Sequence, residues 1–360
     1  MTLKEHLAEL IRLDGPQRVS SLMELALAHP REGYYAAHPA IGAEGDFITA
    51  PEISQAFGEM IGGFALQTWI DMGEPDAWSL IEFGPGRGTL MLDMLRTLRL
   101  RPRALDGLEI VLLEASPTFA QEQRQRLAGM AIRTEWLREI SDLPERPLVL
   151  VANEFFDALP IRQFWRQHGR WFERRVCLKD PDAPTFEFVL LPSAAPLGLL
   201  DAEPAESRIL EASLVARNYA HLISEHLAHA PGRALILDYG HSGEGNGDTL
   251  QAIAGHKRAD VLEALGGADL SAHVDFGALA RMAGEAGVRV DGPVAQGVFL
   301  ERLGIGARFA ALAERATADV REALKRQHHR LTAPGEMGEL FKVLALSSPT
   351  LAPPPGFSDG

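Results

Sequence analysis

The chain of 360 residues contains a single cysteine, Cys177, and shows no pattern typical of export or membrane insertion. One cysteine excludes an internal disulfide and a zinc site built from cysteines alone. The N-terminus lacks a basic segment followed by an apolar one, so we expect no leader peptide. No apolar run is long enough to cross a bilayer. These absences favour a reducing, aqueous compartment.

Basic residues are in the minority. The 49 acidic side chains outnumber the 35 lysines and arginines, which gives a formal net charge of −14 and an isoelectric point near 5.3. Such a charge opposes binding to a nucleic-acid backbone, so we expect no nucleic-acid partner. An acidic surface suits a cationic substrate instead. The 46% of hydrophobic residues is ordinary for a globular protein.

A strand followed by three alternating glycines is the most informative motif of the chain. The apolar run Trp78–Phe83, which contains Glu82, leads into Gly84, Gly86 and Gly88 and then into a helical pattern. The dinucleotide fingerprint is G-x-G-x-x-G, and a P-loop ends in Gly-Lys-Ser/Thr, so neither motif fits. The spacing E-x-G-x-G-x-G is instead common in S-adenosylmethionine (SAM)-dependent methyltransferases. A tight turn without a ligand is the alternative, but the position at a strand end favours a cofactor loop.

Strand and helix signals alternate regularly after residue 77. Strands are expected at residues 78–83, 108–114, 131–133, 147–152, 233–239, 288–290 and 341–346. Near-continuous apolar strands between helices indicate a parallel sheet covered on both faces. We therefore predict an α/β fold with a doubly wound, mostly parallel, seven-stranded Rossmann-like sheet of the class I methyltransferase type, in which the last strand runs antiparallel.

Two stretches of the chain are not part of a minimal sheet of this type. Residues 163–176 alternate aromatics around a glycine turn, which indicates a hairpin, and a further strand is expected at 186–191. Residues 307–331 have a helical pattern. We interpret both as parts of insertions that form a cap over the cofactor site. The predicted organisation is an N-terminal helical segment with a cofactor-closing loop (1–76), a methyltransferase domain (77–350) with insertions near 160–210 and 292–338, and a flexible tail (351–360).

A second block lies upstream of the sheet. A loop rich in small and polar residues precedes Thr49 and Pro51, which mark the start of an amphipathic helix that runs through Trp69. A helix packed on the sheet would explain the helix but not the composition of the loop. Loops of this composition often bind ligands.

Several blocks, in order along the chain, resemble the MidA family of SAM-dependent methyltransferases. They comprise Gly33–Tyr35, residues 41–59, Glu82–Thr89, Asn153–Pro160 and Asp238–His241, with extensions at residues 255–257 and 272–276. The resemblance implies SAM as cofactor and S-adenosylhomocysteine (SAH) as product. The family includes the mitochondrial complex I assembly factor that acts as a protein arginine methyltransferase. An arginine-bearing protein substrate is therefore implied, such as the quinone-site subunit of NADH dehydrogenase (complex I).

The cofactor side of the site can be assigned residue by residue. The three glycines let the backbone approach the methionine part, Glu82 meets the ammonium, and Glu114, at the end of the second strand, accepts the ribose hydroxyls. A merely solvated strand end is the alternative for Glu114. Adenine is expected near Trp136 and Leu137, although an aromatic there also suits a core. The N-terminal loop and the fourth strand complete the set with Asp46, Phe47, Thr49, Ser54 and Asn153.

The acceptor side depends on carboxylates. A guanidinium is cationic near neutral pH, and its nitrogen attacks poorly until a proton is lost or its charge is localised. Glu154 and Asp157 follow the fourth strand, where open α/β sheets bind substrates, so we expect them to recruit and orient the arginine. Asp238 and His241 close the fifth strand and complete the cage, unless they serve as an N-cap or a surface turn. The histidines lack ligand spacing with a carboxylate, so we expect no metal site.

Other functions are weighed against arginine methylation. A SAM-dependent enzyme for a small molecule would have a closed apolar pocket in place of an acidic groove. A noncatalytic assembly chaperone would not require the glycines and Glu114, and an NAD-dependent dehydrogenase conflicts with the glycine spacing. The oligomeric state is open, a homodimer included. We expect a bacterial cytoplasmic protein, or one of the mitochondrial matrix if the source is eukaryotic.

Overall fold

The computed structural model describes residues 2–37, 49–196, 209–243 and 247–358. The chain forms two compact units. The first combines residues 48–155, 219–240 and 279–360, and the second combines residues 1–47, 156–218 and 241–278. The expected N-terminal segment 1–76 is therefore divided between the units, and the expected insertion near 160–210 belongs to the second unit.

The first unit is built on the predicted sheet. Its strands are β2 (Trp78–Phe83), β3 (Leu108–Leu113), β4 (Arg133–Leu137), β5 (Leu148–Asn153), β10 (Gly232–His241), β15 (Arg289–Ala295) and β16 (Phe341–Ser347). Their order is β15-β16-β10-β5-β2-β3-β4. β2 pairs in parallel with β3 and β5, and β10 with β5, whereas β16 runs antiparallel to β10 and β15. The predicted fold and its antiparallel last strand are confirmed.

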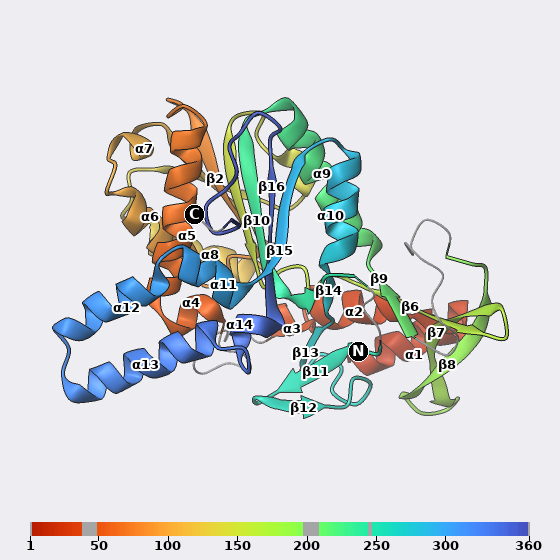
Figure 1. Cartoon of the computed structure of the whole chain (residues 1–360). Helices are drawn as coiled ribbons and strands as arrows, with labels where there is room; N and C mark the ends of the chain where they lie inside the picture. The colour runs from red at the N-terminus through yellow and green to blue at the C-terminus, as the bar shows by residue number, and fades with distance from the viewer. Residues whose placement is uncertain (1, 38–48, 197–208, 244–246, 359–360) are drawn as a thin grey trace. The chain divides into compact units, whose positions relative to one another are not determined.

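Helices cover both faces of this sheet, which explains why its central strands are continuous apolar runs. Figure 1 shows α5 (Gln55–Asp71) and α6 (Thr89–Leu98) on one side, and α9 (Leu214–His229) and α10 (Phe276–Glu285) on the other. Phe57 and Phe64 of α5 and Met91 of α6 join Leu80 of β2 and Val151 of β5 in one buried core.

The first unit contains further helices. They are α4 (Ala50–Ile53), α7 (Arg103–Asp106), α8 (Pro117–Leu127), α11 (Gln296–Arg302), α12 (Ile305–Glu314), α13 (Ala318–Thr332) and α14 (Met337–Leu340), with a 3₁₀ helix at Ile140–Asp142. The helix expected at 307–331 is two helices, because α12 ends at Glu314 and α13 begins after its N-cap, Thr317. None of the helices in the described ranges is long and apolar enough to span a membrane.

The C-terminal segment differs from the flexible tail expected after residue 350. Leu351 is buried, and the carbonyl of Ala352 accepts a hydrogen bond from Arg233 Nη2 at 2.5 Å. The ring of Phe357 lies 5.3 Å from that of Phe299. The fully buried guanidinium of Arg233 needs acceptors, and the phenylalanine pair buries apolar surface, so this segment packs on the first unit through Phe357.

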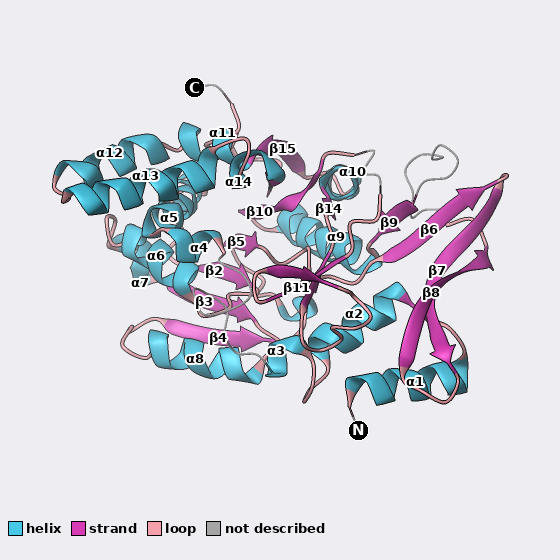
Figure 2. Cartoon of the chain, turned by 90° about the horizontal axis from the view of Figure 1, so that it is seen from below, coloured by secondary structure: helices cyan, strands magenta, loops and turns pink. Residues whose placement is uncertain are grey.

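The second unit has its own core and two small sheets. Its elements are α1 (Leu3–Asp14), β1 (Gln17–Arg18), α2 (Val19–Ala28), α3 (Tyr34–Ala37), β6 (Arg162–Gln167), β7 (Arg170–Asp180), β8 (Thr185–Ser193), β9 (Ile209–Ala212), β11 (Gln251–Ala254), β12 (Lys257–Ala259), β13 (Asp269–Ser271) and β14 (Val274–Asp275). β6 and β7 form the predicted hairpin and β8 pairs with β7, as Figure 2 shows. The apolar face of α1 packs with Phe186 of β8 and Leu270 of β13. These segments therefore pack together around a core of their own, and their role as a cap over the cofactor site stays a prediction.

Candidate cofactor and acceptor site

The glycine motif forms a turn that requires glycine. Gly84, Gly86 and Gly88 have φ values of 60°, 51° and 76°, in the left-handed region that other residues rarely adopt. A Cβ atom on Gly84 would also lie 2.9 Å from Cδ2 of Phe155. Gly88 is the N-cap of α6, so the helix starts directly at the turn. The three glycines therefore form a tight turn between β2 and α6, and their contact with a cofactor stays a prediction.

Glu82 is a buried carboxylate with an unused oxygen. It is 3% exposed, and Met91 provides a backbone hydrogen bond. Its Oε2 has no hydrogen-bond partner among the described residues. Burial raises the pKa of Glu82 well above its usual value, and the charge of Glu114 raises it further. A cation or donor from a ligand would satisfy this oxygen, which fits the predicted contact with an ammonium group.

Glu114 is held at the end of β3 by hydrogen bonds. Its Oε1 accepts from the Ser116 amide at 2.7 Å, and its Oε2 accepts from Gln123 Nε2 at 2.9 Å. Burial raises the pKa of Glu114 to about 7, against the lowering effect of these bonds. An ionised carboxylate has about four acceptor positions, so Glu114 can still accept ribose hydroxyls. These contacts do not support the alternative of a solvated strand end.

Trp136 and Leu137 end β4 beside this carboxylate. The carbonyl of buried Leu137 accepts the backbone amide of Glu114 at 3.1 Å. The indole Nε1 of Trp136 donates to Gln123 Oε1 at 2.9 Å, and the guanidinium of Arg124 lies 4.5 Å from the ring centroid. Arg124 covers one face of the indole, and Trp136 also packs against the core, so an adenine contact here stays a prediction.

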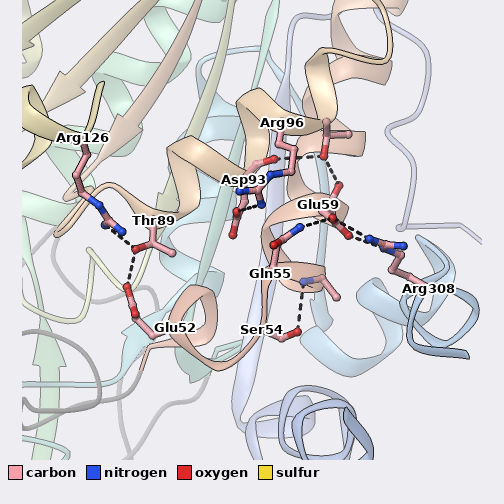
Figure 3. A network of polar contacts seen from close by, with 11 residues as sticks. Glu52, Ser54, Gln55, Glu59, Thr89, Asp93, Arg96, Arg126 and Arg308 are labelled. Carbon is pink, nitrogen blue, oxygen red and sulfur yellow. Dashed lines mark hydrogen bonds and ion pairs between the residues drawn. The ribbon is translucent and has the colours of Figure 1, made fainter. Parts of the chain in front are cut away.

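The N-terminal block reaches the glycine turn through Glu52. Glu52 on α4 accepts from the hydroxyl of Thr89 at 2.6 Å, and Arg126 Nη1 donates to the same hydroxyl at 3.0 Å (Figure 3). Thr89 is the first residue of α6 and follows the last glycine of the turn. Glu52, which was not among the predicted site residues, therefore holds Thr89 at the end of the turn.

The residues predicted from this block have helix-terminal positions where they are described. Ser54 is the N-cap of α5, and its hydroxyl accepts from the Ala56 amide at 3.3 Å. Thr49 is the N-cap residue of α4 but makes no side-chain capping bond. Asp46 and Phe47 lie outside the described residues. Cofactor contacts for this group stay a prediction.

The end of β5 carries Glu154, the principal carboxylate predicted for the acceptor. Its φ of 53° lies in the left-handed region, and such strained residues cluster at functional sites. Its Oε1 accepts from the Ala50 amide at 2.9 Å and from Asn153 Nδ2 at 3.2 Å. The buried Oδ1 of Asn153 has no hydrogen-bond partner among the described residues. Asn153 thus offers an acceptor to a ligand beside the carboxylate.

Asp238 is fully buried, which excludes the surface turn considered for it. Its Oδ2 accepts from the Phe155 amide at 3.2 Å, and its Oδ1 accepts from the Tyr239 amide at 2.9 Å. Asp238 therefore holds the backbone that follows Glu154.

An aromatic cluster at the same place has no counterpart in the sequence analysis. The ring centroids of Phe83 and Phe155 are 5.4 Å apart, and Tyr219 lies 5.8 Å from Phe83 and 5.4 Å from Phe155. The cluster joins the end of β2, the segment after β5 and α9. Since Tyr219 is remote in sequence from the two phenylalanines, no local pattern could have indicated it.

The other two predicted acceptor residues, Asp157 and His241, belong to the second unit. The carbonyl of Asp157 accepts from the Ala272 amide at 3.0 Å. Burial lowers the pKa of His241, while Asp275, 3.9 Å away, favours its charged form. A cage that combines these residues with Glu154 and Asp238 stays a prediction. Within the described ranges, no group of three or more His, Cys, Asp or Glu side chains is placed to hold a metal ion.

Known proteins resemble this chain over most of its length. A family model described as "Putative S-adenosyl-L-methionine-dependent methyltransferase" matches residues 60–294. The zebrafish (Danio rerio) mitochondrial protein arginine methyltransferase NDUFAF7 is 36% identical over 372 residues, which cover 96% of this chain and 86% of that protein. The human protein of the same name is 35% identical, with 95% and 82% covered.

A solved structure resembles both the sequence and the fold. It is a crystal structure of a protein from Burkholderia thailandensis bound to S-adenosyl-homocysteine. It matches with a TM-score of 0.82 and 30% sequence identity, covering 99% of this chain and 95% of that chain.

Proposed function

The chain belongs to this family of S-adenosyl-L-methionine-dependent methyltransferases, and we propose that it methylates arginine side chains of a protein. The observation that carries the proposal is the 36% identity, over 96% of this chain, to a protein named as an arginine methyltransferase. The net charge of −14 supports it, because an acidic enzyme attracts cationic side chains.

The cofactor supplies an electrophilic methyl group on a sulfonium. We propose that Glu82 binds its ammonium group, Glu114 binds its ribose hydroxyls, and the glycine turn admits its methionine part. The unused Oε2 of Glu82 supports this assignment, because a buried carboxylate oxygen needs a donor or a cation. The left-handed glycines support it as well, since they allow the tight turn at the end of β2 that other residues rarely adopt.

For the acceptor, we propose that Glu154 recruits the guanidinium and orients one nitrogen toward the methyl group. A carboxylate beside the guanidinium localises its charge, which makes the in-line displacement easier. The strained backbone of Glu154 and its position after β5 support this role. Asp238 supports Glu154 through the Phe155 amide. We keep Asp157 and His241 as further members of the proposed cage.

The physiological substrate is proposed from the resemblance to the MidA family. A quinone-site subunit of NADH dehydrogenase is the first candidate. The enzyme would then work in the bacterial cytoplasm, or in the mitochondrial matrix of a eukaryote.

Labelling with radioactive SAM tests the function. A proteome from cells that lack this enzyme is incubated with the purified protein, and labelled products are identified. We expect a labelled arginine peptide with the wild type and none with Gly86→Val. Label confined to small molecules would instead indicate a metabolite methyltransferase, and cofactor binding without any transfer would favour an assembly chaperone.

A further inference from the structure

Gln123 is a buried polar residue beside the cofactor contacts. Helix α8 carries three glutamines, of which Gln121 and Gln125 are exposed, whereas Gln123 is 0% exposed. A buried amide is unfavourable unless its polar atoms are hydrogen-bonded. The surroundings of Gln123 must therefore supply both donors and acceptors.

All three hydrogen bonds of Gln123 go to residues assigned to the cofactor. Its Nε2 donates to the Gly86 carbonyl at 2.7 Å and to Glu114 Oε2 at 2.9 Å, and its Oε1 accepts from Trp136 Nε1 at 2.9 Å. A carbonyl and a carboxylate only accept, and an indole N–H only donates. The side-chain amide of Gln123 therefore fits in one orientation only, in which each of its three partners receives its hydrogen bond.

We propose that Gln123 is the positioning residue of the cofactor site, which fixes the Glu114 carboxylate for the ribose and ties it to the glycine turn. It acts through its partners and needs no contact with the cofactor. Its Cγ lies 3.6 Å from the position of a Cβ on Gly88, so the side chain also packs against the last glycine of the turn. This inference rests on the cofactor contacts of the proposed function. It does not depend on whether the methyl acceptor is arginine.

Only an amide side chain of this length can form all three hydrogen bonds, to the Gly86 carbonyl, the Glu114 carboxylate and the Trp136 indole. A glutamate would keep the acceptor for Trp136 but would place a second carboxylate against Glu114 and the Gly86 carbonyl. A methionine would keep the shape but leave all three partners without their bonds. The two replacements therefore separate the effect of charge from the loss of hydrogen bonds.

The hydrogen bond from Gln123 affects the pH at which Glu114 ionises. The hydrogen bond from Gln123 lowers the pKa of Glu114, against the rise that burial causes. On the neighbouring strand β2, the charge of Glu114 raises the pKa of Glu82. Loss of the bond should therefore move the ionisation of Glu114 to higher pH. A glutamine that only stabilised the fold would change the melting temperature without moving this midpoint.

The test is SAH binding by isothermal titration calorimetry between pH 6 and pH 9, with melting temperatures measured without ligand. Gln123→Met should bind SAH about tenfold more weakly at pH 8, as expected for a lost hydrogen bond to a charged group, with its pH midpoint raised. Gln123→Glu should raise the midpoint further, because it adds a like charge. Gln125→Met, on the exposed face of the same helix, should match the wild type in both measurements.

Wild-type affinity and midpoint in both Gln123 variants would overturn the proposal. A lower melting temperature with unchanged affinity and midpoint would overturn it equally, because it would assign Gln123 to folding alone. If Gln123→Met does not fold, Gln123→Glu decides the matter, since it keeps the volume and the bond from Trp136.

Discussion

Glu82 and Glu114 end neighbouring strands, β2 and β3, and burial raises the pKa of both carboxyl groups. Each charge disfavours the other, so the protein without cofactor resists ionising both. A ligand that brings a cation to Glu82 and hydroxyl donors to Glu114 reverses this preference. At the residue scale, cofactor binding should therefore be coupled to the release of protons.

This coupling predicts that SAH affinity falls as the pH drops below about 7, the pKa of Glu114. Above that pH the carboxylate is ionised and accepts both ribose hydroxyls, whereas below it the protonated group cannot. Binding should be about tenfold weaker at pH 6 than at pH 8, since one pKa unit corresponds to a factor of ten. Calorimetry at several pH values measures this. The SAH affinity of Glu114→Gln should not change in this pH range, because the amide does not titrate. A wild-type affinity that stays constant with pH would contradict the role assigned to Glu114.

The acceptor carboxylate gives a second prediction at this scale. Glu154→Gln keeps the shape but removes the charge, so methyl transfer to an arginine peptide should slow by about a hundredfold or more. Single-turnover rates at saturating SAM measure the effect, while SAH affinity should stay near that of the wild type. Asp238→Asn should slow transfer less, because Asp238 accepts from the backbone amides of Phe155 and Tyr239 and so supports Glu154 indirectly. Wild-type rates in both Glu154→Gln and Asp157→Asn would exclude the carboxylate cage.

At the scale of elements, α5 and α6 of the first unit pack closely against each other. A Cβ on Gly58 would lie 2.5 Å from Asp93 Cβ, and one on Gly62 would lie 2.7 Å from Thr97 Cβ. The two helices thus approach closely along a stripe of glycines. Arg308 of α12 adds two bonds to Glu59 of α5, at 2.6 and 3.0 Å (Figure 3).

This close approach predicts that Gly62→Ala destabilises the protein. The added methyl group meets Thr97 on a packed helix, so the free energy of unfolding should fall by about 1–3 kcal/mol. Gly63→Ala is the matched control, because no heavy atom lies within 4 Å of its Cβ position and alanine is the better helix former. Urea unfolding measures the free energy of unfolding of the two variants and of the wild type. Equal stability of the two variants would show that the helices can separate at no cost.

At the scale of the whole molecule, the assigned cofactor contacts with described positions lie in the first unit. Its strand order brings the ends of β2, β3 and β5 together, because these strands are parallel neighbours. The second unit is assembled from three separate segments around a different core.

The architecture of the first unit predicts cofactor choice. The protein should bind SAM and SAH, and NAD far more weakly, because its turn has the methyltransferase spacing in place of the dinucleotide fingerprint. Calorimetry with the three ligands measures this. Gly86→Val should abolish SAH binding while circular dichroism stays native, since valine resists a φ of 51° and fills the ligand's space. Tight NAD binding without a SAM signal would refute the assignment.

The sequence by itself determined the fold class and the family, and it predicted the main cofactor contacts. These features are local: apolar strands, a glycine turn after Glu82, and an acid at the end of the second strand. Local backbone preferences and burial on both faces create such patterns, so they can be seen without any knowledge of distant contacts.

Only the tertiary structure decided which polar residues are buried beside the predicted site residues and form hydrogen bonds with them. Three glutamines of α8 look alike in sequence, and packing alone buries Gln123. Asp238 reaches the Phe155 amide, and Glu154 reaches Ala50, across long stretches of chain. The second unit likewise joins segments that no linker or change of composition marks. Such contacts depend on how elements pack together, and packing between residues far apart in the chain leaves no local pattern to recognise.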